Sequence, residues 1–501
     1  MSNNTVSPPS LKNTLISGAA KMVIARWIVR ILGLLNIIIL ARLLEPSDFG
    51  LIAMSAVLVG ALRVIFSLSI DGALIRNNNA ANEDFDTAWT IGIMQASFIA
   101  AILFIFSVPI GDYFNDERVV DIVRLSALSV IITSFSNIGI VKFRKEFEYS
   151  KEVKFSILAR FISLIATLSL AFYYKNYWGL VYGMVVGAIL RVILSYIMNS
   201  YRPRLTLSKF KSLWSYSYWM IVLNTGMFLS AQGDKYIIGG QVSTNEYGLY
   251  TTAGELAELP TSELIFPISR ALFPGFAKLK EDKKRLKSAV INIIGFLAGI
   301  SIPLGLGLTA ITEQFVYLVL GEKWLQAVPF IQCLALYGVI RVVYSTPRNL
   351  LVVLGKEKQL AALAWANSIV FLTMAYYIIN TYDLISIAIM KVILALPFAF
   401  VSLLYIGRLL SISKQEYLEV MQRPIFSGLI MIVSLNQIPW EWLDSMLLIL
   451  LIKTLTGMIL YAASLITFWV LSNKPEGFES FVISLLTPYK KHLFFRKING
   501  R

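Results

Sequence analysis

The sequence predicts an all-α, polytopic membrane protein of about 14 transmembrane helices, with its N- and C-termini on the cytoplasmic side. Composition supports this first, because 57% of the 501 residues are hydrophobic and only 15% are charged. Fourteen membrane spans need about 280 apolar residues, at about 20 for each span. The observed percentage corresponds to about 286 residues, so the chain has the composition of a protein built almost wholly of spans.

Apolar runs that end at charged residues, glycine or proline define the individual spans. The thirteenth is the weakest, because it is short and contains Asn436 and Gln437. Twelve spans are therefore the alternative count. The expected ranges are 15–41, 48–74, 86–110, 120–141, 154–174, 178–200, 213–239, 247–273, 288–311, 325–354, 359–379, 384–407, 422–438 and 445–472.

The distribution of charge fixes the expected orientation. Lys and Arg exceed Asp and Glu by 45 − 30 = 15, and the excess falls in alternate connections. Basic residues cluster in 142–154, 202–211 and 278–287 and in the C-terminal tail, whereas the opposite connections are mainly acidic. Because basic connections stay in the cytoplasm, both termini are expected there. The same distribution makes nucleic acid the weaker explanation of the net charge.

An internal repeat suggests how the helices are grouped. The motif Asp48-Phe49-Gly50-Leu51 recurs as Glu246-Tyr247-Gly248-Leu249, six expected helices later, and the segments 120–128 and 328–336 share an apolar pattern at a similar separation. Six is an even number, so the copies have one orientation and a pseudo-two-fold axis along the membrane normal would relate them. We expect an N-terminal six-helix lobe at 1–210, a C-terminal six-helix lobe at 211–415, and helices 13 and 14 with a basic tail at 416–501.

Charged residues inside the expected spans are the candidate functional groups, since ionisable side chains at membrane depth are costly and usually face protein or water. Arg26 and Arg30 lie one helical turn apart in a span without acidic residues, and Arg63 lies in the next span. Two uncompensated guanidinium groups predict a water-filled cavity that accepts an anion, and their geometry suits phosphate. The alternative is mutual neutralisation, of Arg63 by Asp71 and of Glu263 by Arg270.

Further candidates are charged residues of the same and other spans. Glu255 and Glu258 lie on one helix face. The role considered for their carboxylates is to bind a coupling cation or a sugar hydroxyl. The remaining secondary candidates are Lys21, Asp71, Arg341 and Lys391.

Several chemistries are excluded by what the sequence lacks. The single cysteine, Cys333, allows no internal disulfide, and the single histidine, His492, allows no histidine-rich metal centre and no Ser/His/Asp triad. No GxxxxGK[ST] phosphate loop occurs. We therefore expect no enzyme, no resident metal and no cofactor. Na⁺, H⁺ and the membrane potential stay open as driving forces.

Short motifs across residues 15 to about 410 carry a family resemblance: 41–44, 48–51, 71–75, 144–147, 234–239, 247–250, 272–274 and 321–324. Together they resemble the Wzx-type polysaccharide flippases of the multidrug/oligosaccharidyl-lipid/polysaccharide (MOP) exporter superfamily, near the colanic-acid branch. The resemblance implies transport of an undecaprenyl-diphosphate-linked oligosaccharide from the cytoplasmic to the periplasmic leaflet of the bacterial inner membrane, by alternating access.

The resemblance also bears on site residues and partners. Related lipid II flippases line a central cavity with arginines of the first, second and eighth spans, and Arg26, Arg30, Arg63 and Arg270 occupy similar places here. Expected partners are membrane lipids, a polysaccharide polymerase and glycosyltransferases, with no nucleic acid. Two alternatives stay open: a multidrug exporter of the same fold, and a non-transporting scaffold for polysaccharide assembly.

Overall fold

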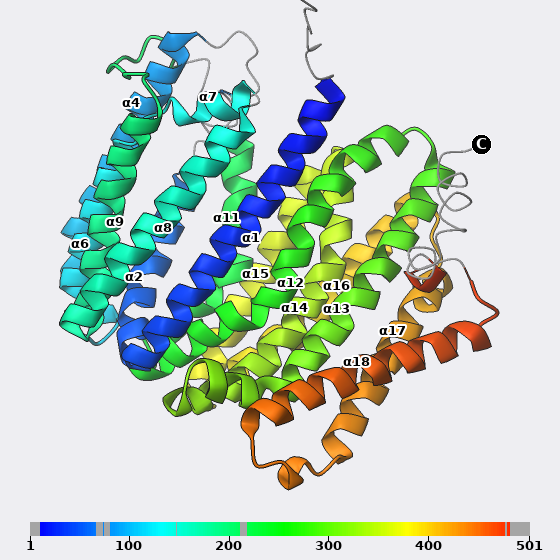
Figure 1. Cartoon of the computed structure of the whole chain (residues 1–501). Helices are drawn as coiled ribbons and strands as arrows, with labels where there is room; N and C mark the ends of the chain where they lie inside the picture. The colour runs from blue at the N-terminus through cyan, green and yellow to red at the C-terminus, as the bar shows by residue number, and fades with distance from the viewer. Residues whose placement is uncertain are drawn as a thin grey trace, which may run out of the picture. The chain divides into compact units, whose positions relative to one another are not determined.

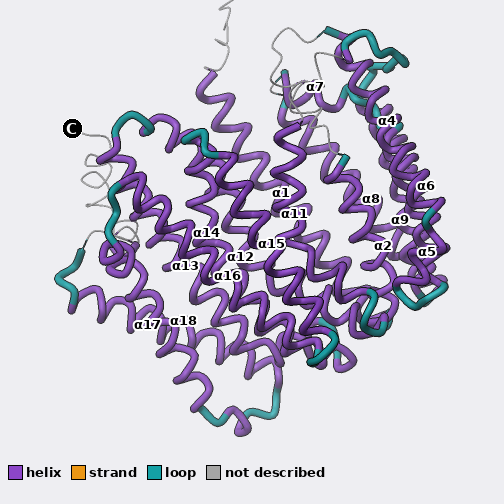
Figure 2. The backbone as a smooth tube through the Cα atoms, turned by 180° about the vertical axis from the view of Figure 1, so that it is seen from behind, coloured by secondary structure: helices purple, strands orange, loops and turns teal. Residues whose placement is uncertain are grey.

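A computed structural model describes residues 11–66, 74, 81–146, 148–210, 218–475 and 478–480 (Figure 1). Within these ranges every regular element is a helix (Figure 2). A described helix overlaps each of the fourteen expected spans, and eleven are long and apolar enough to cross a membrane. The helices at the fourth, seventh and eighth spans are not among these eleven, so the count of fourteen stays a prediction. An all-helical, multi-pass membrane protein is confirmed.

The chain divides into two compact units, Met1–Gly248 and Leu249–Arg501, and each is described by itself. The expected lobes 1–210 and 211–415 and the appendix 416–501 stay predictions. The first unit groups the seventh expected helix with the preceding ones, because that helix packs along α2. The helices of this unit are α1 Leu11–Leu43, α2 Pro46–Ile65, α4 Asn82–Ile105, α5 Ser107–Tyr113, α6 Arg118–Ser134, α7 Ile140–Lys145, α8 Tyr149–Tyr174, α9 Tyr177–Met198 and α11 Tyr218–Gly239.

Two expected spans are broken into two helices. The range 86–110 forms α4 and α5 with a break at Phe106, and Pro109 in the first turn of α5 has no amide hydrogen to continue the earlier helix. The range 120–141 forms α6 and α7. Between them the buried side chain of Asn137 donates to the backbone oxygens of Asn199 and Tyr201, which ties this turn to the end of α9.

A stripe of glycines packs α9 closely against α8. Gly179, Gly183 and Gly187 recur every four residues and therefore share one helix face. A Cβ atom on Gly179 would lie 2.5 Å from Cα of Ala171, and one on Gly183 would lie 2.7 Å from Cα of Thr167. Small residues at this spacing let two membrane helices approach at backbone distance.

The two copies of the repeated motif contact each other reciprocally inside the first unit. A Cβ atom on Gly50 would lie 1.8 Å from the carbonyl oxygen of Thr244, and one on Gly248 would lie 1.9 Å from that of Pro46. Thr244 and Pro46 occupy the same place before each motif, so the two helix N-termini cross symmetrically. Only glycine fits at either position, because the opposing atoms are backbone.

The second unit is arranged around α13. This helix packs against α14, α17 and α18, and α14 packs against α16. A Cβ atom on Gly305 would clash with the side chain of Val339, and one on Gly428 would clash with those of Ile302 and Leu306. Glycine at these two positions therefore allows the neighbouring helices to pack closely. The helices are α12 Thr244–Leu279, whose first turn up to Gly248 belongs to the first unit, α13 Lys283–Val319, α14 Val328–Val353, α15 Glu357–Ile379, α16 Leu384–Leu410, α17 Lys414–Gln437 and α18 Met446–Leu471, with short 3-10 helices at Glu322–Ala327 and Trp440–Trp442.

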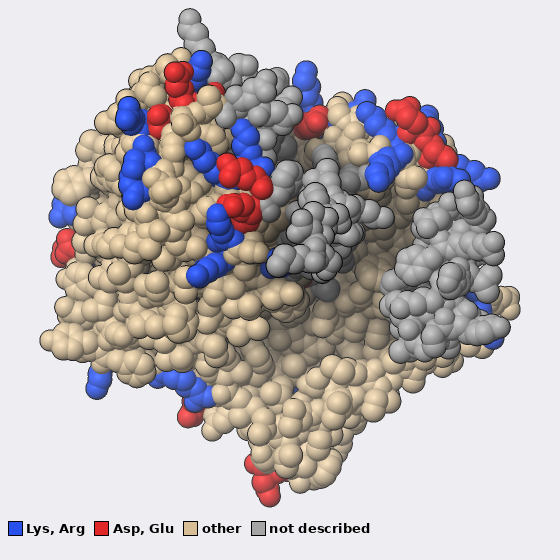
Figure 3. All heavy atoms as spheres, turned by 45° about the horizontal axis from the view of Figure 1, so that its top comes forward, with Lys and Arg blue, Asp and Glu red and all other residues tan. Residues whose placement is uncertain are grey.

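The surface suits a lipid surrounding. Figure 3 shows Lys, Arg, Asp and Glu side chains gathered along the upper part of the view, with a broad uncharged band below. Large apolar side chains such as Phe98, Phe104 and Ile197 are more than half exposed. An apolar band between charged ends is the pattern of helices that face hydrocarbon.

Candidate functional site

The first unit holds the arginines that the sequence singled out on α1. Arg26 and Arg30 lie one turn apart on this helix and are both half-buried. Gly33, on the same face, lies against α8, and a Cβ atom there would be 3.0 Å from an Nη atom of Arg160. The face of α1 that carries Gly33 therefore contacts the guanidinium group of Arg160 on α8. Arg160 is not among the site residues that the sequence predicts.

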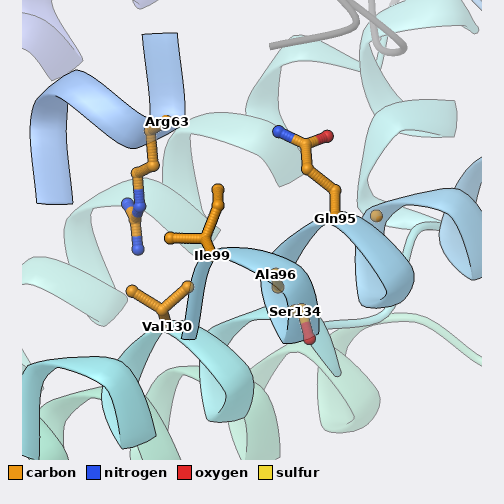
Figure 4. Close-up of a pocket in the computed structure, with 7 residues that line it drawn as sticks. Arg63, Gln95, Ala96, Ile99, Val130 and Ser134 are labelled. Carbon is orange, nitrogen blue, oxygen red and sulfur yellow. The ribbon is translucent and has the colours of Figure 1, made fainter. Parts of the chain in front are cut away.

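Arg63 on α2 lines a cavity within the first unit (Figure 4). The cavity has a volume of about 280 Å³, and Arg63 points toward Ile99 of α4 and Val130 of α6. Gln95 and Ser134 contribute the other polar side chains of the lining. A guanidinium, an amide and a hydroxyl over apolar walls are suited to one anionic or hydroxylated group.

The second unit brings three further candidates together from α12, α14 and α16. Arg341 donates from Nη1 to Oε2 of Glu258 at 2.6 Å. Lys391 is buried, and its Nζ lies 5.0 Å from the ring centre of Tyr337, one turn before Arg341. Glu258 is thus held by an arginine, while Glu255 is exposed. The ion pair links residues 83 positions apart, which no local pattern in the sequence indicates.

The remaining candidates lie apart from these groups or outside the described residues. Lys21 donates to Oγ of Ser150 at the start of α8, at 2.9 Å. Asp71 lies outside the described residues. Arg270 belongs to α12, but its side chain lies outside the described part, so the suggested pairs Arg63–Asp71 and Glu263–Arg270 stay untested. In the part of the chain that the structure describes, no group of three His, Cys, Asp or Glu residues could hold a metal ion.

Comparisons with known proteins place this arrangement among membrane proteins of polysaccharide assembly. A family model described as "Polysaccharide biosynthesis protein" matches residues 39–329, more than half of the chain. An "Uncharacterized membrane protein in cps region" of Klebsiella pneumoniae is 26% identical over 376 residues, which cover 74% of this chain and 77% of that protein. The "Lipopolysaccharide biosynthesis protein WzxC" of Escherichia coli (strain K12) is 25% identical over 358 residues, covering 68% and 70%.

A solved structure shares the fold. The inward closed conformation of the lipid II flippase MurJ superimposes with a TM-score of 0.71 at 14% sequence identity, over 89% of this chain and 98% of that one. At this identity the likeness concerns the fold alone.

Proposed function

Because the chain belongs to the polysaccharide biosynthesis protein family, we propose that it carries an undecaprenyl-diphosphate-linked oligosaccharide from the cytoplasmic to the periplasmic leaflet of a bacterial inner membrane. The match confirms the family resemblance found in the sequence. Together with the shared transporter fold, it supports the expectation of a transporter in polysaccharide biosynthesis, not an enzyme. The identity of the carried lipid is the step that we propose.

The physical problem in such transport is the diphosphate group. Its negative charges cannot enter a hydrocarbon layer about 30 Å thick without compensation. Arg26, Arg30 and Arg63 place guanidinium groups on helices of the first unit, where each planar fork can donate two hydrogen bonds to one phosphate. The same helices expose apolar side chains to the bilayer, so the lipid tail stays in the hydrocarbon layer while the diphosphate contacts the protein. The arginines of the first unit are the single observation that carries the proposal.

The first test measures lipid pools in cells. Mass spectrometry of lipids from cells lacking this protein, compared with a complemented strain, should show accumulation of undecaprenyl-diphosphate oligosaccharide. Protease-free, membrane-impermeant glycosidase treatment of intact inner-membrane vesicles should locate the excess at the cytoplasmic face. Unchanged pools, with the assembly genes expressed and no second flippase present, would contradict the proposal and favour drug export or scaffolding.

A variant pair tests the site. Arg26→Gln combined with Arg30→Gln should reduce transport at least about 100-fold, since two hydrogen bonds to a charged group are lost. Arg124→Gln is the matched control, because Arg124 already has a carboxylate neighbour, Asp121, at 3.6 Å. Equal transport by both variants would remove the α1 arginines from the mechanism.

A further inference from the structure

Two exposed tyrosine pairs lie at matching places in the two units. Tyr173 and Tyr174 end α8 in the first unit, and Tyr376 and Tyr377 lie in the last turn of α15 in the second. The pairs are 376 − 173 = 203 residues apart. The repeated segments found in the sequence are separated by 246 − 48 = 198 and 328 − 120 = 208 residues. The tyrosine pairs therefore belong to the same internal repeat, at the ends of the fifth and eleventh expected spans.

These tyrosines present their side chains to the surroundings of the protein. Tyr173, Tyr376 and Tyr377 are 80%, 65% and 70% exposed. Tyr174 is also exposed, and so is Tyr382 in the connection that follows α15. Among the described residues, no protein group forms a hydrogen bond with any of the five hydroxyl groups. Each side chain thus offers an apolar ring and an unused hydroxyl to a partner outside the chain.

Exposed apolar side chains lead along both helices to these tyrosines. On α15, Ile369 precedes Tyr376 by seven residues, which is two turns along the same face. On α8, Ile165 precedes Phe172 by seven residues, and Tyr173 follows directly. Ile165, Phe172 and Ile369 are all exposed, and the connections after both helices belong to the expected periplasmic series. An apolar face that ends in tyrosine is the order found where a helix leaves the hydrocarbon and enters the headgroup layer.

The arrangement of the rings in the first unit favours a lipid surface over a sugar. A sugar ring stacks on a free, flat aromatic face, but Tyr173 and Tyr174 meet edge to face, with ring centres 5.0 Å apart. Trp178 and Tyr182 of α9 stack on each other at 5.2 Å, and Tyr174 lies 5.3 Å from Tyr182. The rings therefore cover one another's faces. Their hydroxyl and indole groups have no hydrogen-bond partner among the described residues, which suits the boundary between water and lipid.

We propose that the two tyrosine pairs bind the phospholipid headgroup layer at the expected periplasmic face, and that each pair anchors the unit that carries it. Phosphate and ester oxygens of the lipid accept hydrogen bonds from the tyrosine hydroxyl groups, while the rings lie beside the upper part of the acyl chains. The inference goes beyond the proposed function, because it concerns the surrounding membrane and not the transported molecule. A membrane that both units cross explains why the pair occurs once in each.

The first measurement locates the pairs relative to the lipid. In full-length protein with Cys333→Ser, Tyr173→Cys and Tyr376→Cys are each labelled with bimane and reconstituted into vesicles of phosphatidylcholine and phosphatidylglycerol. A nitroxide on the lipid headgroup should quench both labels at least about twofold more than a nitroxide in the middle of the acyl chain or iodide in the water. Ile369→Cys, exposed two turns earlier on α15, is the control for hydrocarbon. Glu281→Cys, exposed in a basic connection, is the control for water.

The second measurement tests whether the tyrosines themselves hold the helices at their depth. Thermal unfolding is followed in phosphatidylcholine vesicles of increasing acyl-chain length. The Tm of the wild type should have an optimum, because anchored helices lose stability when the bilayer is too thin or too thick. Replacing all four paired tyrosines by alanine should remove at least about half of this dependence, and replacing them by tryptophan should keep it. Ile369→Ala with Val370→Ala, an exposed pair two turns earlier, is the matched control and should also keep it.

Each outcome decides the proposal. Headgroup quenching at both positions, together with loss of the chain-length dependence, supports it. Labels quenched mainly by iodide overturn it and place the pairs in water, where a sugar or another protein would be the partner. Labels quenched mainly from the middle of the acyl chain overturn it as well, and headgroup quenching at one position only overturns the anchor of the other unit. An unchanged chain-length dependence in the alanine variant overturns the anchoring role. Lipid pools of the deletion strain decide the flippase function separately.

Discussion

The described arginines of the expected spans are of two kinds, those paired with a carboxylate and those without one. In the described part of the second unit, Arg341 pairs with Glu258 and Arg423 pairs with Glu479. Among the described residues, Arg63 of the first unit lines a cavity and has no carboxylate partner, and Arg348 of the second unit has none either. A paired arginine fastens helices together, whereas an uncompensated one requires a ligand or water. The difference indicates which arginines are available to an anion.

The Arg423–Glu479 pair is the most enclosed example of the first kind. Its atoms Nε and Oε1 lie 3.1 Å apart, and the two side chains are only 5% and 3% exposed. The preceding residue, Phe478, packs onto Gly299 of α13 and contacts Phe296 edge to face. Residues 478–480 are therefore fixed to α17 and α13 by one ion pair and one aromatic ring.

The largest predicted effect contrasts this pair with Arg63. Arg423→Met should lower the free energy of unfolding by about 3–5 kcal/mol, because it leaves the buried carboxylate of Glu479 without a counter-charge. Arg63→Met should cost much less, because no described carboxylate pairs with Arg63 and none is left without its counter-charge. Intrinsic fluorescence during thermal unfolding in detergent measures both. The double variant Arg423→Met with Glu479→Leu should recover most of the loss, and equal destabilisation by the two single variants would break the comparison.

The next effect tests the reciprocal glycine contact. Gly50→Ala and Gly248→Ala should each destabilise the protein by about 1–3 kcal/mol, because the new methyl group meets a backbone carbonyl that cannot turn away. Equal losses are expected, because the two contacts are equivalent. Gly307→Ala is the control, with no atom within 4 Å of the added Cβ, and it should be neutral or slightly stabilising. A loss confined to one position would show that the two motif copies differ.

Whether a feature of the fold or site could be predicted from the sequence depends on how far apart along the chain the interacting residues lie. Apolar runs and charge alternation are local, and they placed a helix at every expected span. The break at Phe106 was missed because Pro109 sits within an otherwise apolar run. Pairs such as Arg341 with Glu258 join distant segments, and helix periodicity does not tell which faces meet.

A smaller effect is expected at the half-exposed pair of the second unit. Glu258→Gln should lower the free energy of unfolding by about 1 kcal/mol or less, because solvent screens a pair in which the Arg341 side chain is 40% exposed. It would also leave Arg341 without its carboxylate partner, as Arg63 is. Calorimetry with sodium pyrophosphate should then detect additional weak binding, and adding Arg341→Gln should abolish that gain. Absence of any gain would show that lack of a carboxylate is insufficient to make an anion site.

The smallest effect concerns an ion pair in the connection before α6. Arg118 donates to both carboxylate oxygens of Asp116, at 2.9 and 2.6 Å. Partial burial alone would raise the pKa of Asp116, but the hydrogen bonds and charge of Arg118 lower it overall. Because this pKa is depressed on folding, the pair stabilises the protein above the unfolded value of about 3.9, and the contribution is lost as pH falls through the folded pKa. Asp116→Asn should cost about 0.2–1 kcal/mol at pH 7. Thermal unfolding should show the difference from wild type vanishing at acidic pH and shrinking in high salt, which screens this exposed pair but not the enclosed Arg423–Glu479 pair.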